Sequence, residues 1–597
     1  MFRLYLSDGY DKLRSIVQRS ASPNQVYDRP LLSVHLSVKN RCCNLRCCGK
    51  MLPPVTVPVA RTIFIYPRRS RQTRLDHDEH KKALLFNHYN YPISMLYDND
   101  AIAWNVTLVT LLVTVTTTIF FWLAPSSPAA SHRCGNSGND TKASLPPFSP
   151  ASFWEVVKRL PGETSQDFLE DQAKAIGCST YRLSLPPLPG LPPLFVVGDP
   201  QLLNDIWKDP TSTKPKALYA GVKSMFKGVD NIGTITDDFH AWKVRRKGAA
   251  PTFASHNLKR MTNAALQGIE KWSEFFIEPS IDNASPFDIA KEMIQIAIVS
   301  ICQHSFDYTL SREEAKTLGQ DLDLAVKEFA LNQMTNPCRR ILFQLLGPYT
   351  KEMAAAVAAT KRTQSLVYKI MKASRENLDR PASTLIESIL SNPGYKDDEE
   401  RYSDILLFIF AGHDTTAYTL AFTLRYLAMN PQEQIKLRQS LLMLPGEERV
   451  NCKALKHVVQ ESMRLSPVAS MAAFRQLGRD FVLSNGDDDN AKILPKGSIA
   501  LMGMYLAHRH PDAFPDDPLA FRPSRWDQQQ NAISKAAFIP FGRGSRDCVG
   551  QRLAIAHIHT ALAYWIARYE FTIVEKGKAV LSGTLRLEGC RLQAHRV

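Results

Sequence analysis

The sequence contains little of what marks a secreted or a nucleic-acid-binding protein. Its eleven cysteines have no disulfide-like spacing, because four crowd into residues 42–48 and the other seven are scattered. This usage is typical of a reducing compartment. No zinc-finger or recognition-helix pattern occurs, so we expect no nucleic-acid partner. A Gly-rich flavin or nicotinamide fingerprint is also missing, so the sequence predicts no flavin or nicotinamide site of its own.

Positive charge is concentrated at the amino-terminal end. Residues 1–94 carry sixteen Lys and Arg against six Asp and Glu, a surplus of +10 within the chain's net +15. We interpret this segment as a basic extension that is either disordered or absent from the native protein, with Met95 as the natural start. Its doubled cysteines suit acylation or metal binding, but a solvated tail is the favoured interpretation. A mitochondrial presequence is the alternative, since such stretches are rich in Arg and poor in acids.

A long uncharged segment follows this extension. Residues 101–124 contain no charged side chain and would span about 35 Å as a helix. We predict a single transmembrane helix here, with a buried core helix as the alternative. Acidic residues precede the segment and basic residues follow it, which favours a cytosolic position for the downstream domain. Residues 125–150, rich in Pro and Ser, have the composition of a linker.

Residues 151–597 form the predicted globular domain. They alternate long helical patterns with a few short β-like runs, such as 195–197 and 571–574, and show no internal repeat. The sequence therefore predicts a mainly α domain with a small β region.

Residues 541–550, FGRGSRDCVG, place one cysteine in a glycine-containing turn before a helical pattern. Gly544 allows a tight hairpin that brings backbone N–H groups toward the sulfur of Cys548. Gly550 lies just before the helix, whose amino-terminal partial positive charge would favour the thiolate. A thiolate held in this way can be the axial ligand of a haem iron, whereas a structural cysteine in a turn is the plain alternative.

The spacing Phe-x-x-Gly-x-Arg-x-Cys-x-Gly resembles the cysteine-ligand signature of the cytochrome P-450 family, the haem-thiolate monooxygenases. The resemblance covers roughly residues 151–597 and implies the family's haem-thiolate fold. It implies haem b as the cofactor, with Cys548 as the iron ligand. Phe541 would then cover the ring and Arg546 would neutralise a propionate, while Gly544 and Gly550 occupy the matching glycine positions.

A second motif lies in the helical stretch of residues 402–427. Its Ala-Gly-His-Asp-Thr-Thr run, residues 411–416, places glycine and paired threonines inside a helix, where they cost stability. The run resembles the family's distal helix, and Asp414 and Thr415 then match the acid and the alcohol that deliver protons. An ordinary kinked core helix is the alternative, and His413 is more often a packing or capping histidine than a ligand.

A third motif joins two separate segments. Glu461 and Arg464 stand at i and i+3 and share a helix face, for which a surface ion pair is the default interpretation. Arg525 resembles the arginine that joins such a pair in a buried network of this family. The three residues would then be structural supports of the haem pocket, and losing one of them would cost several kcal/mol.

Further basic positions suit the haem propionates. Trp242 and Arg246 match the Trp-x-x-x-Arg pattern of the family's proximal-side helix, and Arg475 stands where the family often has a propionate-binding arginine. Bidentate pairing with a carboxylate is the physical reason for arginine at such places.

These motifs occur in family order, from the Trp242 and Arg246 pattern to the Cys548 loop. With the predicted membrane helix they imply a membrane-anchored monooxygenase. It would insert one oxygen atom of O2 into an apolar organic substrate, with electrons from an NADPH-dependent flavoprotein reductase docked near Lys243, Arg245 and Lys247. We expect a single-pass endoplasmic reticulum protein with its catalytic domain in the cytosol. A thiolate-haem isomerase or dehydratase and a non-catalytic haem-binding sensor are the alternatives.

The substrate itself is left open by the sequence. We expect the pocket to be lined from four segments, residues 214–233, 326–346, 408–416 and 467–474. Alanines and large apolar residues in these segments suit a terpenoid, steroid, fatty acid or polyketide equally well.

Overall fold

The computed structural model describes residues 144–160, 163–184, 192–236, 239–333, 336–376, 384–470, 473–483, 491–527 and 531–597. The chain divides into two compact units, residues 1–92 and 93–597, and every described residue belongs to the second. The predicted basic extension, the predicted transmembrane helix and most of the predicted linker therefore lie outside the described residues.

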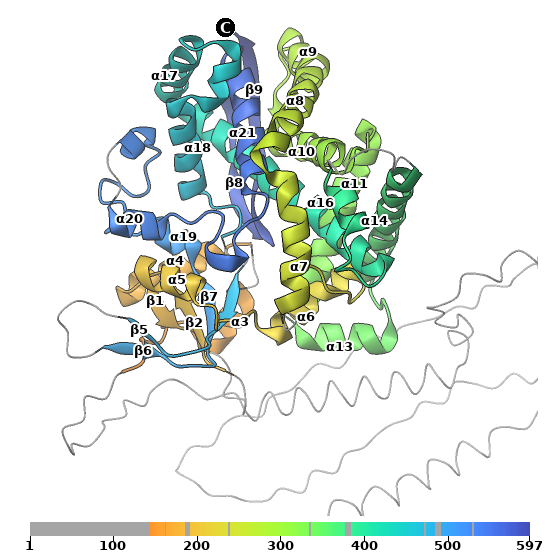
Figure 1. The fold of residues 1–597 in the computed structure, drawn as a ribbon. Helices are drawn as coiled ribbons and strands as arrows, with labels where there is room; N and C mark the ends of the chain where they lie inside the picture. The colour runs from red at the N-terminus through yellow and green to blue at the C-terminus, as the bar shows by residue number, and fades with distance from the viewer. Residues whose placement is uncertain are drawn as a thin grey trace, which may run out of the picture. The chain divides into compact units, whose positions relative to one another are not determined.

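Helices make up most of the described structure (Figure 1). Their bounds are α3 (Phe153–Arg159), α4 (Ser165–Ile176), α5 (Pro200–Lys208), α6 (Lys216–Lys223), α7 (Phe239–Ala249), α8 (Ser255–Trp272), α9 (Glu278–Asp282), α10 (Ile289–Phe306), α11 (Arg312–Ala325), α13 (Pro337–Leu346), α14 (Lys351–Glu376), α15 (Leu385–Ser391), α16 (Asp398–Met429), α17 (Pro431–Leu442), α18 (Lys453–Leu465), α19 (Met504–Ala507), α20 (Ala532–Ala537) and α21 (Gln551–Ile566). The strands are β1 (Thr180–Arg182), β2 (Leu194–Val197), β3 (Phe287–Asp288), β4 (Phe474–Gln476), β5 (Phe481–Leu483), β6 (Lys492–Leu494), β7 (Ile499–Met502), β8 (Tyr569–Ser582) and β9 (Thr584–Arg596). The predicted mainly α domain with a small β region is confirmed.

The strands form three small sheets. One sheet has the order β1-β2-β7-β4, a second has β3-β9-β8, and β5 pairs with β6. The fully buried run Leu194–Val197 pairs in parallel with β7 and antiparallel with β1, as expected for a run that is apolar on both faces. The β8–β9 hairpin contributes apolar residues to the same core as α16 and α21.

The long helix α16 contributes buried residues to both of the two largest hydrophobic clusters. Its first turn is acidic, and the Asp397 carboxylate accepts a hydrogen bond from the backbone N–H of Glu400, so the helix start is well capped. Among the described residues α16 is the one helix long and apolar enough to cross a bilayer, and 72% of its apolar stretch is buried within the protein. Its composition therefore reflects its position in the core.

The glycine inside α16 has a packing reason. A Cβ atom added at Gly412 would approach Cδ1 of Ile301 in α10 to 2.8 Å. Gly412 thus allows α10 and α16 to pack closely, and the same stretch of α16 borders the cavity described below. Close approach of two elements is a common reason for glycine where helix propensity argues against it.

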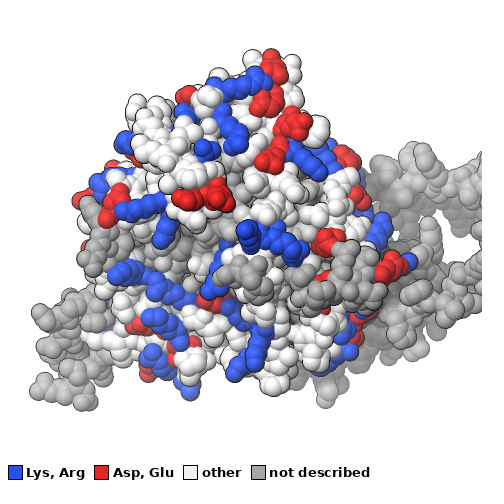
Figure 2. All heavy atoms as spheres, turned by 45° about the horizontal axis from the view of Figure 1, so that its top comes forward, with Lys and Arg blue, Asp and Glu red and all other residues white. Residues whose placement is uncertain are grey.

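Charges of both signs cover the face shown in Figure 2, where Lys and Arg side chains are interspersed with Asp and Glu. On α7, Lys243 and Lys247 are exposed. Arg245, which we expected to face a reductase, is buried instead and pairs with Glu400 at 2.5 Å. That expectation is wrong because the side chain points to the amino-terminal turn of α16, whose acids neutralise it.

Candidate functional site

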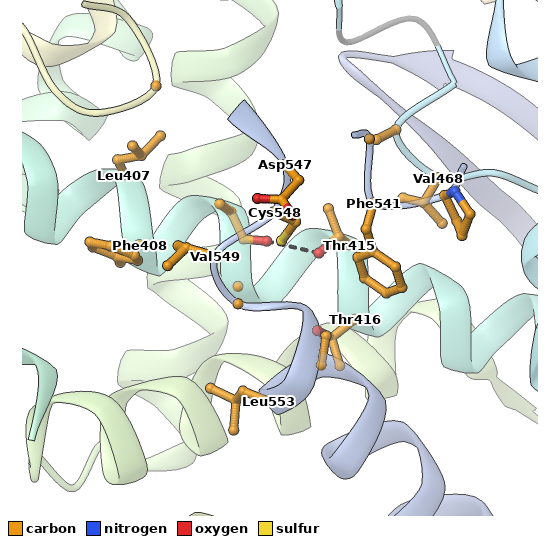
Figure 3. A pocket seen from close by; sticks show the side chains of 18 of the residues that line it. Leu407, Phe408, Thr415, Thr416, Val468, Phe541, Asp547, Cys548, Val549 and Leu553 are labelled. Carbon is orange, nitrogen blue, oxygen red and sulfur yellow. Dashed lines mark hydrogen bonds between the residues drawn. The ribbon is translucent and has the colours of Figure 1, made fainter. Parts of the chain in front are cut away.

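A cavity of about 390 Å³ lies between the loop of residues 540–550 and α16. Figure 3 shows Cys548 on that loop and Thr415 on the facing helix, with Leu553 of α21 closing another side. The volume falls in the range of small-molecule and cofactor pockets. Two segments more than a hundred residues apart in the sequence therefore face each other across one cavity.

The loop that carries Cys548 depends on its glycines. Gly544 has a φ of 75°, in the region that favours glycine, and a Cβ atom there would come within 2.6 Å of the Trp207 carbonyl oxygen. The backbone N–H of Cys548 donates to the Phe541 carbonyl oxygen at 2.9 Å, which closes the turn. The tight hairpin expected at Gly544 is present, and it presents the thiol to the cavity.

Two opposing effects act on the Cys548 thiol. Burial of the thiol by the surrounding protein raises its pKa. The backbone N–H groups of Gly550 and Gln551, at the start of α21, and the charge of Arg246 lower it in part. The helix terminus therefore acts in the expected direction, although burial outweighs it in the protein alone.

Cationic side chains gather at one end of the cavity. Arg546 donates to the Ile235 carbonyl oxygen at 3.1 Å and stacks over Trp242, with its guanidinium carbon 4.1 Å from the ring centre. Arg475, only 4% exposed, stacks over Trp207 at 4.5 Å. Burial and the charge of Arg475 lower the pKa of Arg546 to about 10. The structure thus brings Arg475, Arg546 and Trp242 together as expected.

Arg246 differs from these two arginines because it already has an anionic partner. It donates to the backbone carbonyl oxygen of Asp547 at 2.8 Å and to the Asp547 carboxylate. Arg246 borders the cavity, but in this structure its charge is neutralised beside Cys548. It braces the loop at Asp547, and its expected role toward a propionate stays a prediction.

The cavity wall has the groups that haem requires. A thiol faces one side, and Arg475 and Arg546 form no ion pair with any described carboxylate, so they suit two propionates. The indole N–H of Trp207, buried in the same wall, has no hydrogen-bond partner among the described residues. Phe541 and apolar side chains of α16 and α21 complete a surface that suits a flat, apolar ring.

The predicted acid and alcohol point in different directions. The Thr415 hydroxyl borders the cavity and donates to the Ala411 carbonyl oxygen at 2.8 Å, as Figure 3 shows. The Asp414 carboxylate is 3% exposed, accepts a hydrogen bond from the Thr584 hydroxyl and lies 3.7 Å from a guanidinium nitrogen of Arg586. The structure therefore places Thr415 at the cavity and ties Asp414 to the β8–β9 hairpin.

The Glu461, Arg464 and Arg525 side chains meet in a buried network. Both oxygens of Glu461 accept from Arg464 at 2.9 Å, and one also accepts from Arg525 at 2.8 Å. Trp526 donates to the same carboxylate at 3.0 Å. Burial opposes ionisation of Glu461, but these partners hold its pKa below its ordinary value. The surface ion pair that local spacing suggested is thus a fully bonded core element.

The sequence analysis placed Lys214 and Tyr219 in a lining segment without giving them a role, and it missed two histidines. Lys214 and Tyr219 border the cationic end of the cavity, and the neighbouring His304 and His557 border another part with their ring centres 5.7 Å apart. Burial lowers the pKa of His557 to about 4, so it is a neutral wall residue at neutral pH. No local motif marks these residues, because each comes from a different element.

The expected lining segments are only partly correct. Residues from the 214–233, 408–416 and 467–474 segments border the cavity, whereas no described residue of 326–346 does. Within that last segment, Val326 and Phe329 are buried in the hydrophobic cluster around α11 and α14, and Phe329 packs on Phe343. These apolar residues, which we expected to contact the substrate, are therefore part of the hydrophobic core.

Comparison with known proteins identifies the family. A family model described as Cytochrome P450 matches residues 187–584, about two thirds of the chain. The chain belongs to the cytochrome P450 family. Its relatives include cytochrome P450 3A31 of Mesocricetus auratus, 27% identical over 62% of this chain and 75% of the relative. Cytochrome P450 714D1 of Oryza sativa subsp. japonica is 26% identical over 64% and 69%, and cytochrome P450 9c1 of Drosophila melanogaster is 24% identical over 66% and 81%.

Membership of the cytochrome P450 family establishes the general chemistry. The family binds haem b through a cysteine thiolate and is a family of monooxygenases, so this chain is a haem-dependent monooxygenase. The described fold, mainly α with small sheets, is the fold that the resemblance implied.

Proposed function

We propose that Cys548 is the iron ligand of this cytochrome P450 and that Thr415 serves proton delivery across the cavity. The observation that carries the proposal is their placement on facing walls of one cavity (Figure 3). Arg475, Arg546 and Trp242 would hold the propionate edge. Bound haem would supply the iron centre at which dioxygen is activated for insertion into an apolar organic substrate.

Thr415 is suited to hold and pass a proton at its hydroxyl oxygen. The hydroxyl donates its hydrogen to the Ala411 carbonyl oxygen. The lone pairs of the hydroxyl oxygen can therefore accept a hydrogen bond from a donor in the cavity. Thr416 and Gly412 border the same space and leave room beside it. An isomerase or a haem sensor would not require an alcohol at this place.

Asp414 would act on proton delivery through its neighbours. Its carboxylate is held by Thr584 and Arg586, so it meets the cavity only if that pairing is released. The residue next to it in the chain is Thr415, and a change of side-chain rotamer would bring an acid beside the alcohol. The hairpin would thereby control when the acid takes part.

The proposal includes the electron donor and the location. Electrons would come from a separate NADPH-dependent flavoprotein reductase, for which the exposed Lys243 and Lys247 of α7 offer positive charge. Residues 101–124 would anchor the enzyme as a single span in the endoplasmic reticulum membrane, with the domain facing the cytosol. Peptides from residues 1–94 in the native protein would contradict the proposal that this extension is not part of it.

The ligand assignment is tested by replacing cysteines one at a time. We expect Cys548→Ala to abolish the long-wavelength absorption band that thiolate ligation produces in the reduced carbonyl complex. Cys178→Ala removes a half-buried thiol elsewhere in the domain and should leave the band unchanged. Persistence of the band in the Cys548 variant would show that another residue binds the iron.

A further inference from the structure

A loop of the cavity wall is held by the start of α16. Residues 229–235 precede α7, and Ile232 and Gly233 of this loop border the cavity. The backbone N–H of Ile232 donates to the Asp404 carboxylate at 2.7 Å. Asp404 is 0% exposed and does not border the cavity itself, so it acts on the wall from behind.

A second attachment comes from the neighbouring residue Ser403. Its hydroxyl donates to the Val229 carbonyl oxygen at 3.2 Å and accepts a hydrogen bond from the Asn231 side chain at 3.2 Å. The side-chain oxygen of Asn231 in turn accepts the backbone N–H groups of Gly233 and Thr234, each at 3.0 Å. The loop is thus folded around Asn231 and attached to two consecutive residues of α16.

The next turn of α16 reaches the cavity. Leu407 and Phe408 follow Asp404 by one turn and border the cavity, as Thr415 does further along the helix (Figure 3). A Cβ atom added at Gly233 would lie 3.1 Å from the Leu407 side chain, so the loop and the helix are in contact at the wall. One helix therefore carries the proposed proton-delivery alcohol and fixes a loop that borders the same cavity.

The Asp404 carboxylate is buried among charged and titratable groups. These are Arg245 of α7, Tyr395 of the loop before α16, and Glu400 and Arg401 of α16. Arg245 pairs with Glu400 at 2.5 Å but lies 4.0 Å from Asp404, so its charge is neutralised mainly by Glu400. Burial raises the pKa of Asp404 to about 6, and the Ile232 N–H and the neighbouring groups oppose this rise only in part.

We propose that Asp404 is a positioning residue for substrate selection, which acts by fixing the Ile232 side of the cavity wall. The ionised carboxylate accepts the Ile232 N–H in a charge-assisted hydrogen bond, which is stronger than a bond to a neutral acceptor. Loss of this bond would loosen the loop and weaken the binding of molecules that reach it. The inference rests on the proposed function, because it assumes that haem and substrate share this cavity.

The size of the ligand separates an effect on the wall from an effect on haem. Imidazole, N-phenylimidazole and N-dodecylimidazole are titrated into the haem-loaded enzyme while the haem absorption spectrum is followed, since all three bind iron through the same type of nitrogen. Asp404→Leu keeps a similar volume but removes the acceptor. We expect it to weaken at least one substituted imidazole by about fivefold or more and to leave imidazole within about twofold, because a charge-assisted hydrogen bond is lost at the wall alone.

Two variants give the matched comparison. Asp404→Asn keeps an acceptor for the Ile232 N–H and should weaken the same ligand less than Asp404→Leu does. Asp398→Asn removes an exposed acid in the first turn of the same helix, where it pairs with Arg375, and should change the binding of none of the three ligands. In Asp404→Leu, an equal loss for all three ligands, or no loss for either substituted imidazole, would overturn the proposal.

A double-mutant cycle tests whether Asp404 acts through Ile232. Ile232→Ala shortens the wall side chain without changing the buried acid, so it should weaken the same substituted imidazole. In the Ile232→Ala background, Asp404→Asn should have a smaller effect than in the unaltered enzyme. Additive effects would show that Asp404 acts elsewhere and would contradict the proposal. The cycle decides the question even if Asp404→Leu does not incorporate haem.

The pH dependence gives an independent measurement. Binding of the affected ligand is compared in the unaltered enzyme and in Asp404→Asn from about pH 7.5 to about pH 5, so that protonation of the ligand itself cancels. The unaltered enzyme should bind more tightly at the upper end, where Asp404 is ionised, and this advantage should disappear as the pH falls through about 6. A constant ratio of the two affinities would reject the role of the carboxylate charge and with it the proposal.

The thiolate band of the reduced carbonyl complex reports the proposed function separately. A normal band without a size-dependent effect of Asp404→Leu would reject only the role of Asp404. An absent band in the unaltered enzyme would reject the iron ligand.

Discussion

The two walls of the cavity are built in different ways. The cysteine side consists of a short loop and a buried network, in which Glu461 meets Arg464 only three residues away and Arg525 from one further segment. The α16 side depends on contacts between distant elements, since Asp414 bonds Thr584 across 170 residues of sequence. The cysteine wall is therefore held beside a fully bonded buried carboxylate, whereas the acid on the α16 wall has its partners on the β8–β9 hairpin.

The difference concerns what each wall must do. A thiolate ligand has to stay in one place, and the buried Glu461 carboxylate accepts five N–H groups from segments that precede the cysteine loop. Proton delivery needs a group that changes partners, and an acid shared between a threonine and an arginine can do so. The predictions below test this contrast, starting from the largest expected effect.

Breaking the network around Glu461 should destabilise the domain and weaken haem binding at the cysteine wall. Glu461→Gln leaves Arg464 and Arg525 buried without their anion, so we expect a loss of about 3–5 kcal/mol in the free energy of unfolding and poor haem incorporation. Denaturant unfolding and the haem-to-protein ratio measure both. Glu433→Gln breaks an exposed pair with Lys436 at the same i and i+3 spacing and should cost no more than about 0.5 kcal/mol. Similar losses for the two variants would contradict the buried-network interpretation.

Breaking the contact between Asp414 and the β8–β9 hairpin should lower the coupling of the reaction, measured as the yield of product per NADPH consumed, more than it lowers stability. Arg586→Met leaves Asp414 with Thr584 as its partner, and we expect a loss of about 1–3 kcal/mol in stability together with a lower yield of product per NADPH consumed. Thr584→Val tests the other partner of the same acid. Arg591→Met lies on the same strand, pairs with the exposed Glu575 and serves as the matched control. Unchanged coupling in Arg586→Met would show that the hairpin does not act on proton delivery.

Mild acid should weaken the cysteine wall gradually. His508 accepts a hydrogen bond from the Ile539 N–H at 3.0 Å, close to the cysteine loop, and burial lowers its pKa from 6.5 to about 3. The unfolded chain takes up a proton below pH 6.5 while the folded protein does not, so this contribution to stability is lost as the pH falls from 6.5 toward 3. The slope reaches at most about 1.4 kcal/mol per pH unit.

The pH dependence is measured by unfolding at several pH values between 7 and 4. His508→Gln can accept the same N–H but does not titrate, so its stability should fall less steeply than that of the unaltered enzyme. Parallel curves for the two proteins would place the acid sensitivity on other buried histidines, such as His557.

Local patterns predicted the parts of the site that are themselves local. The glycines around Cys548, the i and i+3 pair at Glu461 and the alcohol at Thr415 all stand where a short spacing or a single turn positions them. The fold class followed from long helical patterns with few β-like runs, for the same reason. Local patterns did not predict the direction of the Asp414 side chain or the burial of Arg245. A helix has several faces, and tertiary packing decides which face meets a partner.

The chain's sequence by itself determined the reaction class, the loop proposed to hold the haem ligand and the mainly α architecture, because each depends on residues close together along the chain. Tertiary structure decided the charge balance of the cavity. Lys214, Arg475 and Arg546 come from three segments, and only the folded chain brings them to one cavity, where none of them pairs with an acid of the described residues. Electrostatic energy depends on distance in space and on burial, neither of which a linear pattern records. The cationic end of the cavity is therefore a consequence of the fold.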